Sequence, residues 1–169
     1  IALMQEQSSL PAFRRNGALK YTACVEGWAM YCEWLGEEMG IYLQNEERFG
    51  RLNMEMWRAV RLVVDTGIHL YGWSRERALA YMTEHVALPA AAISSEIDRY
   101  IALPGHALAY QLGNLTLRGL RRSTEHELGD CFSLRDFHDQ LIRSGPVSLR
   151  VLERLTREWT DAQRERFIA

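Results

Sequence analysis

The stretch Tyr21–Cys32, which reads YTACVEGWAMYC, indicates how this chain folds. Eleven of its twelve residues are apolar, aromatic or small, and Glu26 carries the one charge. On a helix this run is apolar nearly all round, so Glu26 is expected to be buried. A buried carboxylate is costly unless it is paired, protonated or bound to a metal. Glu26 is therefore either a structural Glu held by an Arg or a functional carboxylate. Gly27 beside it indicates close approach of another backbone or of a ligand.

The helical period continues outward from this stretch. Apolar positions recur at three and four residues almost throughout, and no alternating strand pattern is present. We predict an all-α, bundle-like array of about seven to eight helices in a single domain over residues 1–169. The predicted helices cover residues 1–7, 18–39, 46–70, 75–85 after a Ser74 cap, 89–102, 105–128, 134–143 after a Ser133 cap, and 149–169 after a Ser148 cap.

The composition narrows the class of protein. The 169 residues are 47% hydrophobic and 25% charged, as in ordinary globular proteins. A net charge of -2 argues against a nucleic-acid binder. No apolar run approaches the roughly 18 residues of a membrane-spanning helix. Three cysteines are an odd number, which argues against a disulfide framework, and Cys24 and Cys32 are predicted to be small core residues.

One helix face carries a polar stripe. Arg58, Arg61, Asp65 and His69 follow one another at steps of three and four residues, which places them on one side of a helix. Asp65 could bind a metal or orient an imidazole. The alternative is a solvated stripe of ion pairs.

A second candidate region runs from Pro104 to Asn114. Tyr110 follows His106 by one helical turn, and a tyrosine hydroxyl can donate to a developing oxyanion. His106 is either a general acid or a helix cap, and Tyr110 is alternatively an ordinary aromatic core residue. The sequence contains no HExxH, paired CxxC, GxSxG or P-loop motif, so taken alone it has no complete catalytic set.

Several stretches together resemble a known family. The run Val25–Gly36 looks like the EGWA.Y.EWLG signature of the bacterial family called domain of unknown function 885. The resemblance covers nearly the whole chain and includes residues 61–69, 98–100 and 104–113, and, weakly, 132–138. His106 stands where the family commonly has Gln.

That family resembles zinc metallopeptidases with an HExxH motif and a distant Glu ligand. The resemblance implies that this chain is the C-terminal part of a larger peptidase, inactive alone and without zinc. The HExxH-like motif would lie upstream, and Glu26 would be the third zinc ligand. The segment Tyr110–Asn114 also looks like part of the thermostable carboxypeptidase family, which implies that Tyr110 faces the zinc.

Further roles follow from the same implied mechanism. Tyr110 would stabilise the oxyanion, with His69 or Tyr100 as helpers, and His106 is a further candidate at the site. Arg58 or Arg61 would bind the terminal carboxylate of a peptide. The implied partners are a peptide substrate, the N-terminal portion of the same protein, and a second copy through exposed apolar surface. Substrate, cleavage mode and compartment stay open.

Two other functions remain open. The first is a non-catalytic helical scaffold or interaction module, in which Glu26 pairs with an Arg. The second is a self-contained metal carrier that uses Asp65, His69 and Glu26, although these residues have no recognised ligand spacing.

Overall fold

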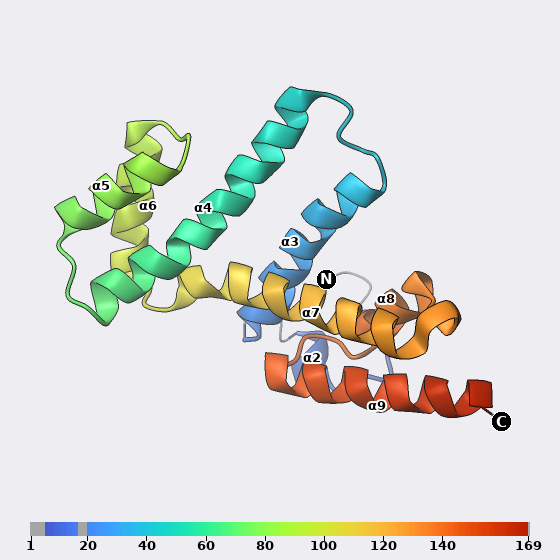
Figure 1. Cartoon of the computed structure of the whole chain (residues 1–169). Helices are drawn as coiled ribbons and strands as arrows, with labels where there is room; N and C mark the ends of the chain where they lie inside the picture. Colours follow the sequence, from blue (N-terminus) through green and yellow to red (C-terminus); the bar gives the residue numbers. More distant parts are fainter. Residues whose placement is uncertain (1–5, 17–19, 169) are drawn as a thin grey trace. The chain divides into compact units, whose positions relative to one another are not determined.

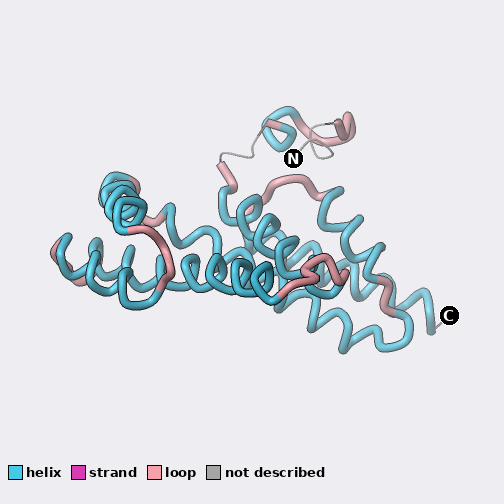
Figure 2. The backbone as a smooth tube through the Cα atoms, turned by 90° about the horizontal axis from the view of Figure 1, so that it is seen from above, coloured by secondary structure: helices cyan, strands magenta, loops and turns pink. Residues whose placement is uncertain are grey.

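The computed structural model describes residues 6–16 and 20–168 as helices joined by short loops (Figure 1). This part of the chain contains no strand (Figure 2). The predicted all-α, bundle-like fold is confirmed. The described elements are α2 (Ala12–Arg15), α3 (Thr22–Glu38), α4 (Asn45–His69), α5 (Arg75–His85), α6 (Ala90–Ala102), the 3-10 turn η1 (His106–Leu108), α7 (Ala109–Leu128), the 3-10 turn η2 (Gly129–Cys131), α8 (Leu134–Arg143) and α9 (Leu149–Ile168).

Side-chain caps fix several helix starts. The Ser74 hydroxyl accepts a hydrogen bond from the Arg77 backbone N–H at 3.2 Å, and α5 begins where predicted. Ser133 caps α8 in the same way, with 3.3 Å to the Asp136 N–H. At the start of α4, the Glu47 carboxylate accepts from the Gln44 N–H at 3.0 Å. These contacts satisfy backbone donors that a first helical turn leaves unpaired.

The structure differs from the predicted boundaries in three places. The short helix α2 was not predicted, and α3 begins at Thr22 rather than at residue 18. The predicted helix 1–7 lies mostly outside the described residues, and its last two residues are not helical. The predicted helix 105–128 opens with η1, because Gly105 has a positive φ of 78° that does not continue into an α-helix.

The chain divides into two compact units. One contains Ala29–Leu112, and the other contains Ile1–Trp28 together with Gly113–Ala169. The single-domain organisation stays a prediction, and each unit is described by itself.

The unit Ala29–Leu112 has a core shared by α4, α5, α6 and η1. Figure 1 shows α5 and α6 beside the C-terminal part of α4. Met82 of α5 and Ile97 of α6 are fully buried against Val64 of α4. The buried core residues are Val60, Val64, Ala78, Met82, Val86, Ile93, Ile97, Tyr100 and Ala107.

The other unit contains a close crossing of α3 and α7. A Cβ added to Gly27 would collide with the backbone of Gly113, and a Cβ added to Gly113 would lie 2.7 Å from the Gly27 Cα and collide with the Ala23 carbonyl oxygen. Of the two alternatives predicted at Gly27, another backbone or a ligand, the structure shows another backbone. Only hydrogen fits between these two helices at this point.

The two cysteines of α3 differ from each other. Cys24 is buried, as predicted, and burial raises the pKa of its thiol. Cys32 is exposed, so its predicted place in the core is wrong. The fully buried Tyr31 takes the inward direction on that turn, and the next residue on a helix points about 100° away.

Candidate functional site

The polar stripe of α4 is buried at its centre. Arg61 is 4% exposed and Asp65 is 2% exposed. The alternative of a solvated stripe of ion pairs is therefore wrong for these two residues. Burial of two charged side chains requires specific partners, because each loses its hydration.

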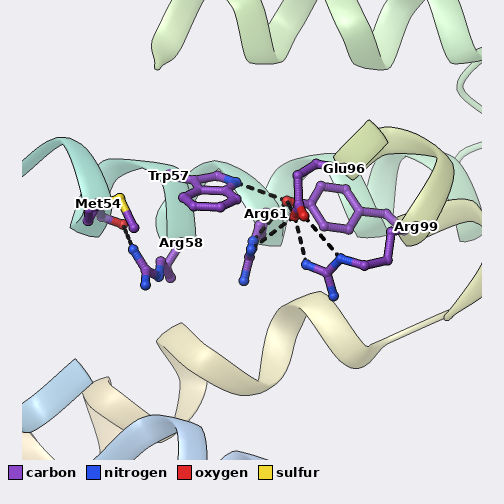
Figure 3. Close-up of polar contacts among 7 residues, drawn as sticks. Met54, Trp57, Arg58, Arg61, Glu96 and Arg99 are labelled. Carbon is purple, nitrogen blue, oxygen red and sulfur yellow. Dashed lines mark hydrogen bonds and ion pairs between the residues drawn. The ribbon is translucent and has the colours of Figure 1, made fainter. Parts of the chain in front are cut away.

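Arg61 is the centre of a hydrogen-bonded network (Figure 3). Its Nε donates to the Tyr100 hydroxyl at 2.8 Å, and its Nη2 donates to Glu96 Oε2 at 3.0 Å. The Trp57 indole N–H donates to the same hydroxyl at 3.0 Å, and the hydroxyl donates to Glu96 Oε2 at 2.8 Å. Arg99 adds hydrogen bonds from Nε and Nη2 to the Glu96 carboxylate. Residues of α4 and α6 are thereby joined around one carboxylate.

The network shifts the ionisation of Tyr100. Burial raises the pKa of Tyr100 to about 12, against the opposing charge of Arg61. The hydrogen bond to Glu96 raises the pKa further, whereas the hydrogen bond from Trp57 lowers it. The phenol is therefore a neutral donor at physiological pH, and its oxygen is already occupied by three partners.

Glu96 stays ionised within the network. Burial opposes its charge, but hydrogen bonds from Arg99 and Tyr100, together with the charge of Arg61, hold the pKa of Glu96 below its ordinary value. The hydrogen bond to Glu96, together with the charge of that carboxylate, raises the pKa of the Arg99 guanidinium against the opposing effect of burial. One carboxylate thus accepts hydrogen bonds from two arginines.

Asp65 and His69 hold the connection that leads to Tyr110. Both Asp65 carboxylate oxygens accept from the Gly105 backbone N–H, at 3.0 and 3.1 Å. The His69 Nε2 lies 2.9 Å from the Tyr100 carbonyl oxygen. Each side chain therefore binds backbone near the end of α6 or the start of η1.

Tyr110 stands against Arg61. The Arg61 Cζ lies 4.6 Å from the centroid of the Tyr110 ring, and the His106 ring meets the same ring edge-on at 5.9 Å. The His106 Nδ1 is buried and has no hydrogen-bond partner among the described residues. The structure thus brings Tyr110, Arg61, Tyr100 and His106 into one neighbourhood, with Asp65 and His69 supporting the adjoining turn.

Arg58 lies one turn before Arg61 and is held more loosely. Its Nη1 donates to the Met54 carbonyl oxygen at 3.0 Å, and its Nη2 reaches Glu33 at the long distance of 3.4 Å (Figure 3 shows the first contact). The side chain is 13% exposed and its partner Glu33 is 37% exposed. A carboxylate from another molecule could exchange with this weak partner.

Glu26 is partly rather than fully buried, so the prediction of a buried carboxylate is corrected. Gly27 takes the position of closest contact with α7, and Glu26 lies about 100° around the helix from it. Among the described residues Glu26 forms no ion pair, so the proposed structural pairing with an Arg is not seen there.

Comparison with known families decides the relationship of the chain. The family described as "Bacterial protein of unknown function (DUF885)" matches residues 1–155. The chain belongs to this family. The resemblance inferred from Val25–Gly36 and the later stretches is therefore confirmed for the family, whose description assigns no activity.

A solved structure extends the comparison. The DUF885 chain is 44% identical to a crystal structure described as "the putative lipoprotein from Colwellia psychrerythraea", with a TM-score of 0.90. The match covers 95% of this chain and 27% of the other chain. This DUF885 chain therefore corresponds to roughly a quarter of that protein. No curated protein matches the chain.

Neither a metal-ligand group nor a membrane-spanning helix is found in the part of the chain that the structure describes. Among the residues that the structure describes, no three His, Cys, Asp or Glu side chains form a group that could hold a metal ion. Within the same residues, no helix is both long and apolar enough to cross a membrane.

Sequence reasoning missed three network residues, namely Trp57, Glu96 and Arg99. Glu96 precedes Arg99 and Tyr100 by three and four residues, and Trp57 precedes Arg61 by four. These spacings place each pair on one helix face. The helical spacing was therefore a usable signal in the sequence. It was not recognised, because neither Ser94–Glu96 nor the apolar setting of Trp57 resembles a site motif.

Proposed function

We propose that this chain is the C-terminal part of a zinc-dependent peptidase of the DUF885 family. The observation that carries the proposal is Glu26, a partly buried carboxylate on an apolar helix that forms no ion pair among the described residues. A carboxylate in that setting suits a metal ligand, because the ion supplies the missing positive charge.

The chain fits zinc as a donor of one ligand only. Glu26 has the right chemistry, whereas the described residues contain no complete ligand group. The other ligands would come from histidines ahead of this chain in the same polypeptide, as in the zinc peptidases that the family resembles. Bound zinc would polarise a peptide carbonyl and lower the pKa of a water.

The residues of this chain would then bind and orient the substrate. The Tyr110 hydroxyl would donate a hydrogen bond to the oxygen on which negative charge develops. Of the two candidate arginines, Arg58 is better suited to a substrate carboxylate, because its contact with Glu33 is long and partly exposed. His69, Tyr100 and His106 would help to hold Tyr110 and the bound substrate in position.

Zinc content tests the proposal. The polypeptide that includes the sequence preceding Ile1 is purified and analysed by elemental mass spectrometry, as wild type, Glu26→Ala and Glu33→Ala. Glu33 is a matched control, since it is a partly buried Glu on the same helix that already pairs with Arg58. We expect about one zinc per chain in wild type and control, and a large loss in Glu26→Ala.

Two results would overturn the proposal. A folded wild type without zinc would favour the non-catalytic scaffold, with Glu26 as a structural carboxylate. Zinc retained in Glu26→Ala would remove this residue from the ligand set.

The role of Tyr110 has its own test. Tyr110→Phe should lower kcat by about 100-fold on a mixture of unmodified peptides, while zinc stays bound, because the variant loses only the hydroxyl donor. An unchanged kcat would refute the role.

A further inference from the structure

The Arg61 guanidinium lies close to three aromatic rings, those of Trp57, Tyr110 and, at 5.5 Å, Tyr100. Its Cζ lies 4.4 Å from the centroid of the Trp57 ring and 4.6 Å from that of Tyr110. The side chain is only 5% exposed. A guanidinium over an aromatic face is attracted by the ring electrons, and the attraction increases when water is excluded. The contact between Arg61 and Tyr110 is thus a desolvated one.

Hydrogen bonds fix the orientation of the guanidinium. Nε is held by the Tyr100 hydroxyl and Nη2 by Glu96, and Trp57 donates to that same hydroxyl. Two hydrogen bonds from a planar fork determine both the place and the tilt of the plane. The ring of Tyr110 therefore rests against a cation that cannot turn.

The burial of the remaining Arg61 nitrogen, Nη1, argues that the guanidinium contacts aromatic rings and does not bind a substrate carboxylate. Nη1 is buried and has no hydrogen-bond partner among the described residues. A substrate carboxylate would need open access to this atom, whereas the atom has almost no exposed surface. The contacts with Trp57 and Tyr110 compensate part of the lost hydration.

We infer that Arg61 is a positioning residue that fixes the ring of Tyr110 and places a positive charge against it. The inference rests on the proposed function, in which the Tyr110 hydroxyl meets developing negative charge. A cation close to the ring strengthens hydrogen-bond donation by the phenol, because it favours negative charge on the phenol oxygen. Arg61 then acts through Tyr110 and does not touch the substrate.

Nuclear magnetic resonance tests the contact without any activity measurement. The protein carries ring-labelled tyrosine, and the Tyr110 signal is assigned by its loss in Tyr110→Phe. Arg61→Met removes the charge and should move the Tyr110 ring signals toward those of a solvent-exposed tyrosine. The control Arg75→Met removes a partly exposed arginine that pairs with Asp98, and should leave those signals in place.

A second variant covers the case in which Arg61→Met does not fold. Trp57→Leu keeps Arg61 but removes one of the rings beside the guanidinium and the hydrogen bond to Tyr100. Arg61 then gains freedom, and the Tyr110 signals should shift and broaden. Unchanged Tyr110 signals in folded Trp57→Leu and Arg61→Met would overturn the inference.

Kinetics separate positioning from substrate binding. In the zinc-loaded longer polypeptide, Arg61→Lys should lower kcat about tenfold with little change in KM, because the charge is kept but the planar guanidinium and its paired hydrogen bonds are lost. A raised KM with unchanged kcat would make Arg61 a substrate ligand and overturn the inference. If zinc is absent from the wild type, the proposed function fails while the resonance result still decides the contact.

Discussion

Tyr100 combines deep burial with three polar partners. Its hydroxyl meets Trp57, Arg61 and Glu96, and the side chain is 1% exposed. We expect Tyr100→Phe to lower the free energy of unfolding by about 2 kcal/mol, because it leaves buried donors without an acceptor. Urea unfolding followed by circular dichroism at neutral pH measures this loss.

The raised pKa of Tyr100 predicts that the folded protein loses stability at alkaline pH. The pKa of Tyr100 is about 12 in the folded state, against an ordinary value of 10.0. The resulting stabilisation is fully present below pH 10 and is lost as the pH rises from there to about 12, since only the unfolded chain releases the proton. The unfolding free energy of wild type should fall in this range more steeply than that of Tyr100→Phe. Equal slopes would contradict the assignment.

The lowered pKa of Glu96 predicts that the folded protein loses stability at acidic pH. Its pKa is lowered from the ordinary value of 4.5, so its stabilisation is present above this value and is lost as the pH falls below it. Wild type should therefore lose stability on acidification more steeply than Glu96→Gln. The exposed Glu84, changed to Gln, serves as the control and should retain the wild-type slope.

At the scale of the helix, the crossing of α3 and α7 allows a paired test on one element. Gly113→Ala should lower the unfolding free energy by about 3 kcal/mol or more, because its Cβ would meet backbone that has nowhere to move. Gly119→Ala, on the same helix, meets nothing within 4 Å and should raise stability by about 0.5–1 kcal/mol. Thermal unfolding of both variants checks the two signs, and a stable Gly113→Ala would refute the close crossing.

The helices were more predictable than the site. The caps at Ser74 and Ser133 depend on neighbours within one turn, so sequence alone located them. The spacing of Arg61 and Asp65 likewise predicted a shared helix face. Whether that face meets water depends on α6 and η1, which lie about forty residues further along the chain. For the same reason the network around Glu96 could not be predicted from α4 alone.

At the scale of the molecule, exposed apolar side chains suggest association. Phe49, Leu52 and Met56 of α4 are 63%, 54% and 49% exposed and line a groove of about 480 Å³ with Val86. Exposed contiguous apolar surface favours contacts between molecules. Leu52→Glu should reduce self-association in sedimentation velocity at high protein concentration, with no loss of thermal stability. Leu70→Glu, at an exposed site outside the groove, is the control.

The match to a much longer solved protein determines which polypeptide each experiment should use. The match covers 27% of that chain, so under the proposed function the peptidase activity would be a property of a longer polypeptide. The stability and resonance experiments use this chain directly, whereas zinc and peptide cleavage are tested in the longer protein.

The glycine pair at the crossing of α3 and α7, Gly27 and Gly113, fixes how these two helices pack against each other. If α3 slid or rotated by one residue, Glu26 or Trp28 would replace Gly27 at a point where only hydrogen fits. The pairing therefore permits a single register between α3 and α7. That register determines the direction in which each neighbouring side chain of α3 points. The direction in which Glu26 points is thus encoded by the residue that follows it, which has no side chain of its own.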